Sequence, residues 1–220
     1  PASPAAQVPL GLEGILAAKE ETAAGRAASV FRMRSPSYMA LVRFHLRELG
    51  RYPRYLWRLL RRPTRIRLRG VWLDLGAEMS KAARQLLYSE RYERGESRCV
   101  ILALTPDDVV LEVGSGIGYL SALCALRLGS GKVHTYEANP DLIPVIVRNH
   151  SLNGVSPSVS NAMLADRTGV TRFFPAENFF SSTGVETSSA PPGIHVPTLS
   201  VREELARIRP TFVLMDIEGG

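Results

Sequence analysis

Cysteine is scarce in this chain, because Cys99 and Cys124 are the only two among 220 residues. So few cysteines cannot form a disulfide framework, which is typical of a reducing, cytoplasmic environment. Both lie in apolar segments, so we expect buried thiols. No HExxH, paired CxxC or P-loop string occurs, and we therefore predict no metal site.

Long apolar runs are also absent, and none approaches the roughly 20 residues that a membrane-spanning helix needs. Residues 1–28 are rich in Ala, Pro and Gly and lack the pattern of a signal peptide, so we expect them to be mostly disordered. Acidic residues are nearly missing from residues 26–69, where 13 Arg face the single acid Glu48. The rest of the chain is mildly acidic.

The basic region predicts an N-terminal arm ahead of one α/β domain. Apolar and aromatic residues interleave with arginine over 29–63, which indicates one or two amphipathic helices. We expect them to cover the core with their arginines facing water; contact with a polyanion or an anionic membrane surface stays open. Residues 64–87 predict a hairpin, from strict alternation over 65–75, and a connecting helix. The domain itself is predicted over 88–220.

The most informative motif lies at the start of that domain. A buried-type apolar strand, 109–113, carries Glu112 and is followed by Gly114, Gly116 and Gly118. A strand that enters a glycine turn and a helix lets a ligand approach bare backbone. The dinucleotide fingerprint requires its third glycine at the position of Tyr119, which disfavours a dehydrogenase. The order E-x-G-x-G-x-G is similar to the first motif of class I S-adenosylmethionine (SAM) methyltransferases.

Acidic residues follow the next two apolar segments. Glu137 closes a predicted strand 19 residues after Gly118, a spacing typical of an acid that binds ribose hydroxyls. A third predicted strand, 159–165, ends in Asp166, which we expect near the adenine. Between the strands, the sequence predicts helices from Tyr119 to a stop at Gly129, and from a cap at Asn139 to about residue 153. We therefore predict one nucleoside pocket at the strand ends.

A fourth strand is predicted at 212–215, after a helix that Ser200 caps and Pro210 ends. Asp216 follows this strand and should emerge beside the crevice where ligands bind in open α/β sheets. Methyl transfer to oxygen needs a group that removes the hydroxyl proton. Asp216 and Glu218 are the candidates for this role; residues two apart share one side of an extended chain.

Four segments together resemble the FkbM family of methyltransferases. They are residues 92–96, 108–114, 136–140 and the pair 196–199 with 214–220. The Val-Pro-Thr-Leu and Asp-x-Glu-Gly runs of the last pair are the most specific for this family. Family members often carry Ala-Asn after the first glycine, whereas this chain has Ser115 and Gly116. The resemblance implies SAM-dependent methylation of a hydroxyl on a small molecule or glycan. It also implies that the cofactor is held by Glu112, Gly114, Gly116, Gly118, Tyr119, Glu137 and Asp166.

The expected fold is a Rossmann-like class I methyltransferase sheet with an N-terminal helical arm. Only the first four of seven strands precede residue 220, so we expect the closing strands to be missing and the open edge to permit homo-oligomer pairing. A second hypothesis is a nonenzymatic nucleoside-binding half-domain whose Arg-rich arm binds RNA or a membrane surface. SAM binding would separate the two.

Overall fold

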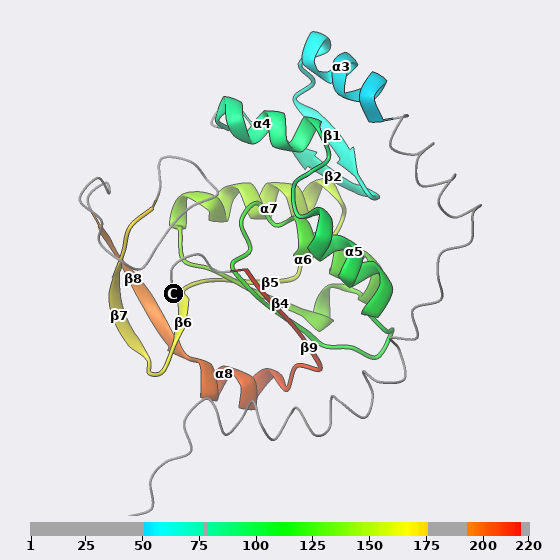
Figure 1. Ribbon diagram of the computed structural model, residues 1–220. Helices are drawn as coiled ribbons and strands as arrows, with labels where there is room; N and C mark the ends of the chain where they lie inside the picture. The colour runs from blue at the N-terminus through cyan, green and yellow to red at the C-terminus, as the bar shows by residue number, and fades with distance from the viewer. Residues whose placement is uncertain (1–50, 77–78, 176–192, 217–220) are drawn as a thin grey trace, which may run out of the picture. The chain divides into compact units, whose positions relative to one another are not determined.

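The computed structural model describes residues 51–76, 79–175 and 193–216. Every described residue belongs to one compact unit, residues 49–220. Its elements are, in chain order (Figure 1), α3 (Arg51–Arg61), β1 (Arg65–Leu68), β2 (Val71–Asp74), α4 (Lys81–Tyr88), α5 (Arg94–Ala103), β3 (Val110–Val113), α6 (Tyr119–Leu128), η1 (Ser130–Lys132), β4 (Val133–Glu137), η2 (Pro140–Leu142), α7 (Ile143–Leu152), β5 (Ser158–Asn161), β6 (Met163–Ala165), β7 (Gly169–Phe173), β8 (Ile194–Ser200), α8 (Val201–Ile208) and β9 (Phe212–Met215). In the described ranges, no helix combines the length and the apolar character that crossing a bilayer requires.

The main sheet has four parallel strands in the order β5-β4-β3-β9. Parallel neighbours need crossover connections, and α6 and α7 supply them between β3, β4 and β5. The chain then returns to place β9 on the other side of β3, in register from Val110 opposite Phe212 to Val113 opposite Met215. The strand order therefore reverses at β3, which is where open α/β sheets bind ligands. This arrangement confirms an α/β fold compatible with the Rossmann-like prediction.

Local sequence signals explain where these elements begin and end. The α6 helix stops at Gly129, whose φ of +89° suits a residue without Cβ. The Asn139 side chain accepts a hydrogen bond from the amide of Asp141, 3.0 Å away, and caps the short η2 turn that leads into α7. Ser200 caps α8 through the amide of Glu203. These boundaries agree with the sequence prediction.

The alternating segment forms the predicted hairpin, β1–β2, and its second strand packs on α6 and α7. Its inward residues are buried in the main hydrophobic core, whereas its outward ones include arginines and a half-exposed Trp72. Asn149 joins the hairpin to the loop between β3 and α6: its Oδ1 accepts from the amide of Asp74, and its Nδ2 donates to the carbonyl of Ile117, each at 2.8 Å. Asn149 is fully buried, so these bonds have no competition from water.

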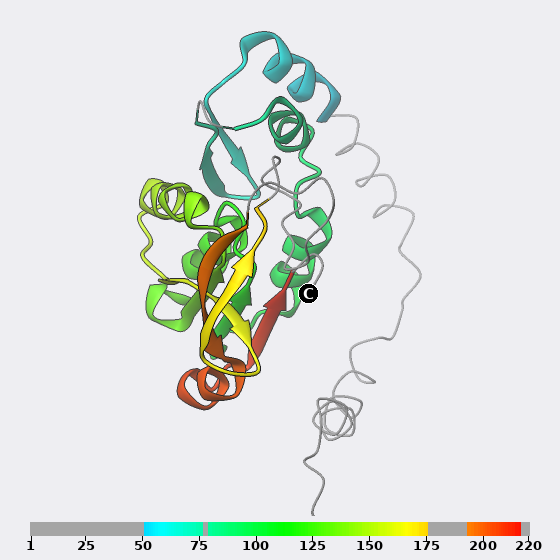
Figure 2. The same ribbon diagram turned by 90° about the vertical axis from the view of Figure 1, so that its left-hand side faces the viewer.

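The predicted strand 159–165 is wrong, because the structure divides it between two sheets. The main-sheet strand β5 ends at Asn161, whose side-chain amide donates to the carbonyls of Glu137 and Ala138. After the buried Ala162, β6 joins a separate three-stranded sheet of order β6-β8-β7. Figure 2 shows β7 and β8, in yellow and orange, beside the sheet that contains β9, in red. The apolar run is one segment in sequence but two strands in space.

One expectation about exposure holds only in part, and another is wrong: Arg54 and Arg61 face water as expected, and Tyr55 and Leu59 pack on the core, but other side chains differ. In α3, Arg58 is buried at 8% exposure and donates to the carbonyl of Tyr88, whereas Leu60 is 84% exposed. Tyr52, Leu56 and Trp57 face solvent as well, so α3 does not simply direct its arginines to water. Cys99 is exposed, although Cys124 is buried as expected. Apolar neighbours in the sequence therefore did not determine which side chains of α3, or of α5 with its Cys99, are buried.

Candidate cofactor site

The glycine loop follows β3 directly at the carboxyl end of the sheet. Gly114, Gly116 and Gly118 have φ values of +85°, +53° and +75°, a region that residues with Cβ rarely adopt. The amides of Gly114 and Ser115 both donate to the carbonyl of Tyr136, at 2.9 and 3.2 Å. The loop is therefore fastened to the end of β4, the strand that carries Glu137.

Glu137 is the last residue of β4 and lies directly against this loop. Its Oε2 accepts a hydrogen bond from the amide of Gly116 at 2.9 Å, and its Oε1 accepts from the amide of Asn139 at 2.8 Å. Burial raises the pKa of Glu137, while the backbone amides oppose that rise. Each carboxylate oxygen retains a second lone pair, so the group can accept further donors such as ribose hydroxyls.

Glu112 lies beneath the loop, buried at 3% exposure. Its Oε2 accepts hydrogen bonds from the hydroxyls of Thr135 and Ser115, the latter at 3.1 Å. Burial raises the pKa of Glu112 to about 7, and these hydroxyl donors lower it in part. The structure thus gives Glu112 a place within a polar network that supports the loop from below.

That network extends to a histidine for which the sequence suggested no role. The Ser115 and Ser121 hydroxyl oxygens lie 3.4 Å apart, and the Ser121 hydroxyl lies 3.0 Å from Nε2 of His150. Burial lowers the pKa of His150 to about 4, so the ring is neutral at physiological pH. A Cβ added at Gly118 would lie 3.1 Å from the same Nε2. His150 therefore packs against the back of the loop.

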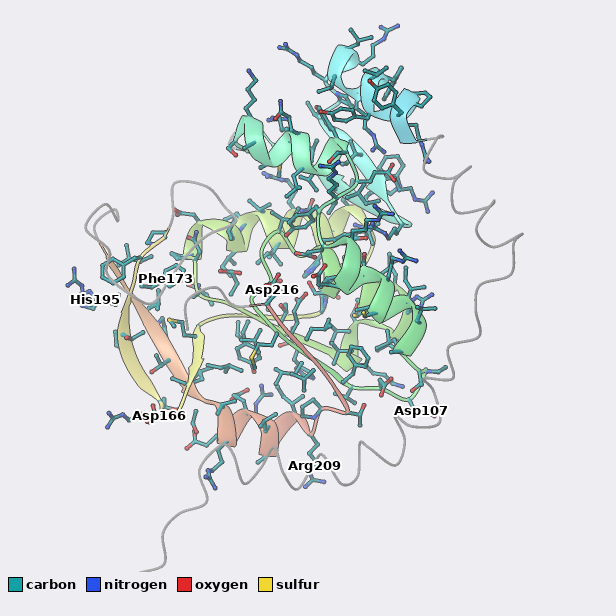
Figure 3. The ribbon with its side chains drawn as sticks, viewed as in Figure 1. Asp107, Asp166, Phe173, His195, Arg209 and Asp216 are labelled. Carbon is teal, nitrogen blue, oxygen red and sulfur yellow. The ribbon has the colours of Figure 1, made fainter. Side chains whose placement is uncertain are left out.

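Asp216 follows β9 and reaches the same end of the sheet. Its amide donates to the carbonyl of Val113 at 3.0 Å, which places it beside the residue that precedes the glycine loop. Its side chain is exposed, and Figure 3 shows it at the end of β9 that lies away from α8. The second candidate for proton removal, Glu218, lies outside the described residues.

Two of the predicted cofactor residues are placed differently from the prediction: Tyr119 follows the loop but has its side chain in the core, and Asp166 lies elsewhere. Tyr119 is fully buried, and its hydroxyl accepts from Nη1 of Arg69 at 3.1 Å. Asp166 lies in the turn between β6 and β7, beside α8 in Figure 3. Because Asp166 does not follow a strand of the main sheet, the structure does not bring it to Glu137 and Asp216. Asn161 ends the third parallel strand instead.

Glu93 joins the site although sequence reasoning gave it no role. A Cβ added at Gly116 would lie 2.8 Å from the Tyr92 hydroxyl and 3.8 Å from Oε1 of Glu93, so both side chains lie over the loop. Burial raises the pKa of Glu93 well above its usual range, and the charges of Glu112 and Asp216 raise it further. No spacing rule links Glu93 to the motif; its segment stood out only through the family resemblance.

These contacts make a cradle whose residue types suit SAM. Bare glycine backbone permits close approach, Glu137 offers acceptors for hydroxyl groups, and Glu93 places a further carboxyl group against the loop, whose charged form a cation would favour. Across the described ranges, no group of three or more His, Cys, Asp or Glu side chains is arranged to hold a metal ion. Nucleoside binding is therefore the chemistry that this arrangement favours.

Comparison with known proteins gives a partial likeness. No protein-family model matches the chain. Over 52 residues it is 46% identical to the ribosomal RNA small subunit methyltransferase A of Rubrobacter xylanophilus, a match that covers 24% of this chain and 19% of that protein. The chain thus spans about a fifth of the length of the curated relative it matches. The match supports SAM-dependent methylation in general.

Proposed function

We propose that this chain is a SAM-dependent methyltransferase of FkbM type that methylates a hydroxyl oxygen of a small molecule or glycan. The observation that carries the proposal is the bond between the Gly116 amide and the Glu137 carboxylate, because it joins the glycine loop to the second acid at the reversal of strand order. The resemblance of residues 196–199 and 214–220 to the FkbM family supports the finer assignment.

The residues divide the work between binding and proton transfer. Gly114, Gly116 and Gly118 leave room for the cofactor, and Glu137 holds its ribose. When bound, SAM would supply an electrophilic methyl group for transfer to the acceptor oxygen and would leave as S-adenosylhomocysteine. Asp216 accepts the hydroxyl proton from the acceptor, since its carboxylate is exposed at the end of β9, beside the residue that precedes the glycine loop.

Isothermal titration and methyl incorporation test this function together. We expect SAM to bind and NAD not to bind. Glu137→Gln should weaken SAM binding roughly 10-fold or more, because a charged acceptor for hydroxyl groups is lost. Asp216→Asn should retain SAM binding but lose most turnover with a hydroxyl acceptor, by about 100-fold or more. Absence of SAM binding by the unaltered chain would contradict the proposal.

A second acceptor class is favoured by a different observation. The matched relative is named for ribosomal RNA, and the α3–β2 region exposes Arg54, Arg61, Arg65 and Arg67 together with Trp57. Arginines that contact phosphates and aromatic rings that stack on bases are the common means of binding single-stranded RNA. Tritium transfer from labelled SAM to ribosomal RNA, compared with transfer to small hydroxyl acceptors, separates the two. Salt-dependent RNA binding without any transfer would indicate a nonenzymatic module.

A further inference from the structure

The Glu93 carboxylate is the least compensated polar group of the cradle. Its Oε2 is buried and has no hydrogen-bond partner among the residues that the structure describes. Glu93 also has a left-handed backbone, with φ +40° and ψ +42°, at the residue before α5. A buried carboxylate oxygen without a donor is costly, and such groups in native proteins are commonly completed by a ligand or an ion.

The surroundings of Glu93 specify the sign of that ligand. The charges that act on its carboxyl group come from Glu112, Asp216 and Glu96, and all of them are negative. Its other oxygen, Oε1, lies 3.8 Å from the position that a Cβ would take at Gly116, and the Tyr92 hydroxyl, which hydrogen-bonds to this carboxyl group, lies 2.8 Å from the same position. A cation is therefore the partner that both the unmet oxygen and the surrounding carboxylates favour.

We propose that Glu93 accepts a hydrogen bond from the ammonium group of the methionyl tail of the cofactor. This inference rests on the proposed function, since it names a residue for the amino-acid end of SAM. The missing partner of Oε2 is a hydrogen-bond donor, which an ammonium supplies and a sulfonium does not. The ribose has its own acceptor in Glu137, whose two oxygens are held by the amides of Gly116 and Asn139.

Three ligands separate these chemical groups in a titration of the full chain. SAM carries both sulfonium and ammonium, S-adenosylhomocysteine carries the ammonium alone, and methylthioadenosine carries neither. Glu93→Gln keeps the shape of the side chain and removes its charge. We expect it to weaken binding of SAM and S-adenosylhomocysteine by about 10- to 100-fold, the loss typical of a charged hydrogen bond. Binding of methylthioadenosine should stay within about twofold.

Asp107→Asn is the matched control, because Asp107 is an exposed acid ahead of β3, at the opposite end of that strand from the glycine loop. It should leave all three affinities within about twofold. Retained methylthioadenosine binding by Glu93→Gln also shows that the variant folds and that its nucleoside pocket is intact. Glu93→Asp, which keeps the charge on a shorter side chain, should recover part of the lost SAM affinity.

Each other outcome has a distinct meaning. If Glu93→Gln binds SAM as the unaltered chain does, the inference is overturned and the proposed function stands. If SAM alone weakens and S-adenosylhomocysteine does not, Glu93 acts on the sulfonium and the ammonium assignment is wrong. Equal loss of all three ligands would show a structural role and overturn it as well. If the unaltered chain binds no SAM, the proposed function itself fails.

Discussion

Glu112 should make the stability of this protein depend on pH in a predictable direction. Burial raises its pKa from 4.5 to about 7 in the folded state. The folded protein therefore retains the proton to a higher pH than the unfolded chain does. The stability is fully present below the unfolded pKa and falls as pH rises toward the folded pKa, after which it levels off.

The size of the effect follows from that difference in pKa. Each tenfold change in proton affinity corresponds to about 1.4 kcal/mol, so the Glu112 contribution amounts to about 3 kcal/mol in total. Glu112 is almost completely buried, so solvent screening reduces this value little. Most of the loss should occur between about pH 5 and pH 7.

This pH-dependent loss of stability can be measured by urea unfolding at several pH values, with the unaltered chain compared with Glu112→Gln. The substituted glutamine amide cannot ionise, so the variant should gain about 2–3 kcal/mol relative to the unaltered chain between about pH 5 and pH 8. The comparison cancels the contributions of Glu93 and Glu137, whose pKa values are also raised, except for the part that their interaction with the Glu112 charge adds. Glu96→Gln, at an exposed position, is the control. A free-energy difference that does not change with pH would refute the reasoning.

Two further substitutions test how the site is held. Gly118→Ala should lower the unfolding free energy by about 1–3 kcal/mol, because φ is +75° and the new Cβ would lie 3.0 Å from Ile146. Gly131→Ala is the control in thermal melting, because nothing lies within 4 Å of a Cβ added there. Equal effects of the two substitutions would contradict the prediction. Asn149→Ala should lower the unfolding free energy by about 2–5 kcal/mol, since the amide of Asp74 and the carbonyl of Ile117 both lose a buried partner. Ser151→Ala, at an exposed position on the same helix, should change the urea midpoint little. Equal midpoints for the two variants would contradict this prediction.

Much of the region from β3 to α7 was predictable because its signals are local. A glycine with positive φ, a cap at Asn139 or Ser200 and a strand of buried apolar residues each act within a few positions of the chain. The spacing from Gly118 to Glu137 is set by one helix and one short strand. The prediction that Glu137 and the glycine loop lie together is therefore confirmed by the bond to the Gly116 amide.

The rest depended on contacts between distant residues. Arg58 is buried because Tyr88 and Glu90, 30 and 32 positions away, accept its hydrogen bonds, and no periodicity reveals that. The position of Asp166 was predicted wrongly, because the sequence pattern of the half-buried strand β6 does not indicate which of the two sheets it joins. Glu93 reaches Gly116 from outside the strand–loop–helix motif, and only the fold brings the two together.

The most direct test of the account is a crystal structure of the chain with S-adenosylhomocysteine. We predict that the ligand lies over Gly114, Gly116 and Gly118, with its ribose hydroxyls donating to the carboxylate of Glu137. A ligand bound elsewhere on the molecule, or a ribose that does not contact Glu137, would contradict the claim that this loop and the acid at the end of β4 form one cofactor site.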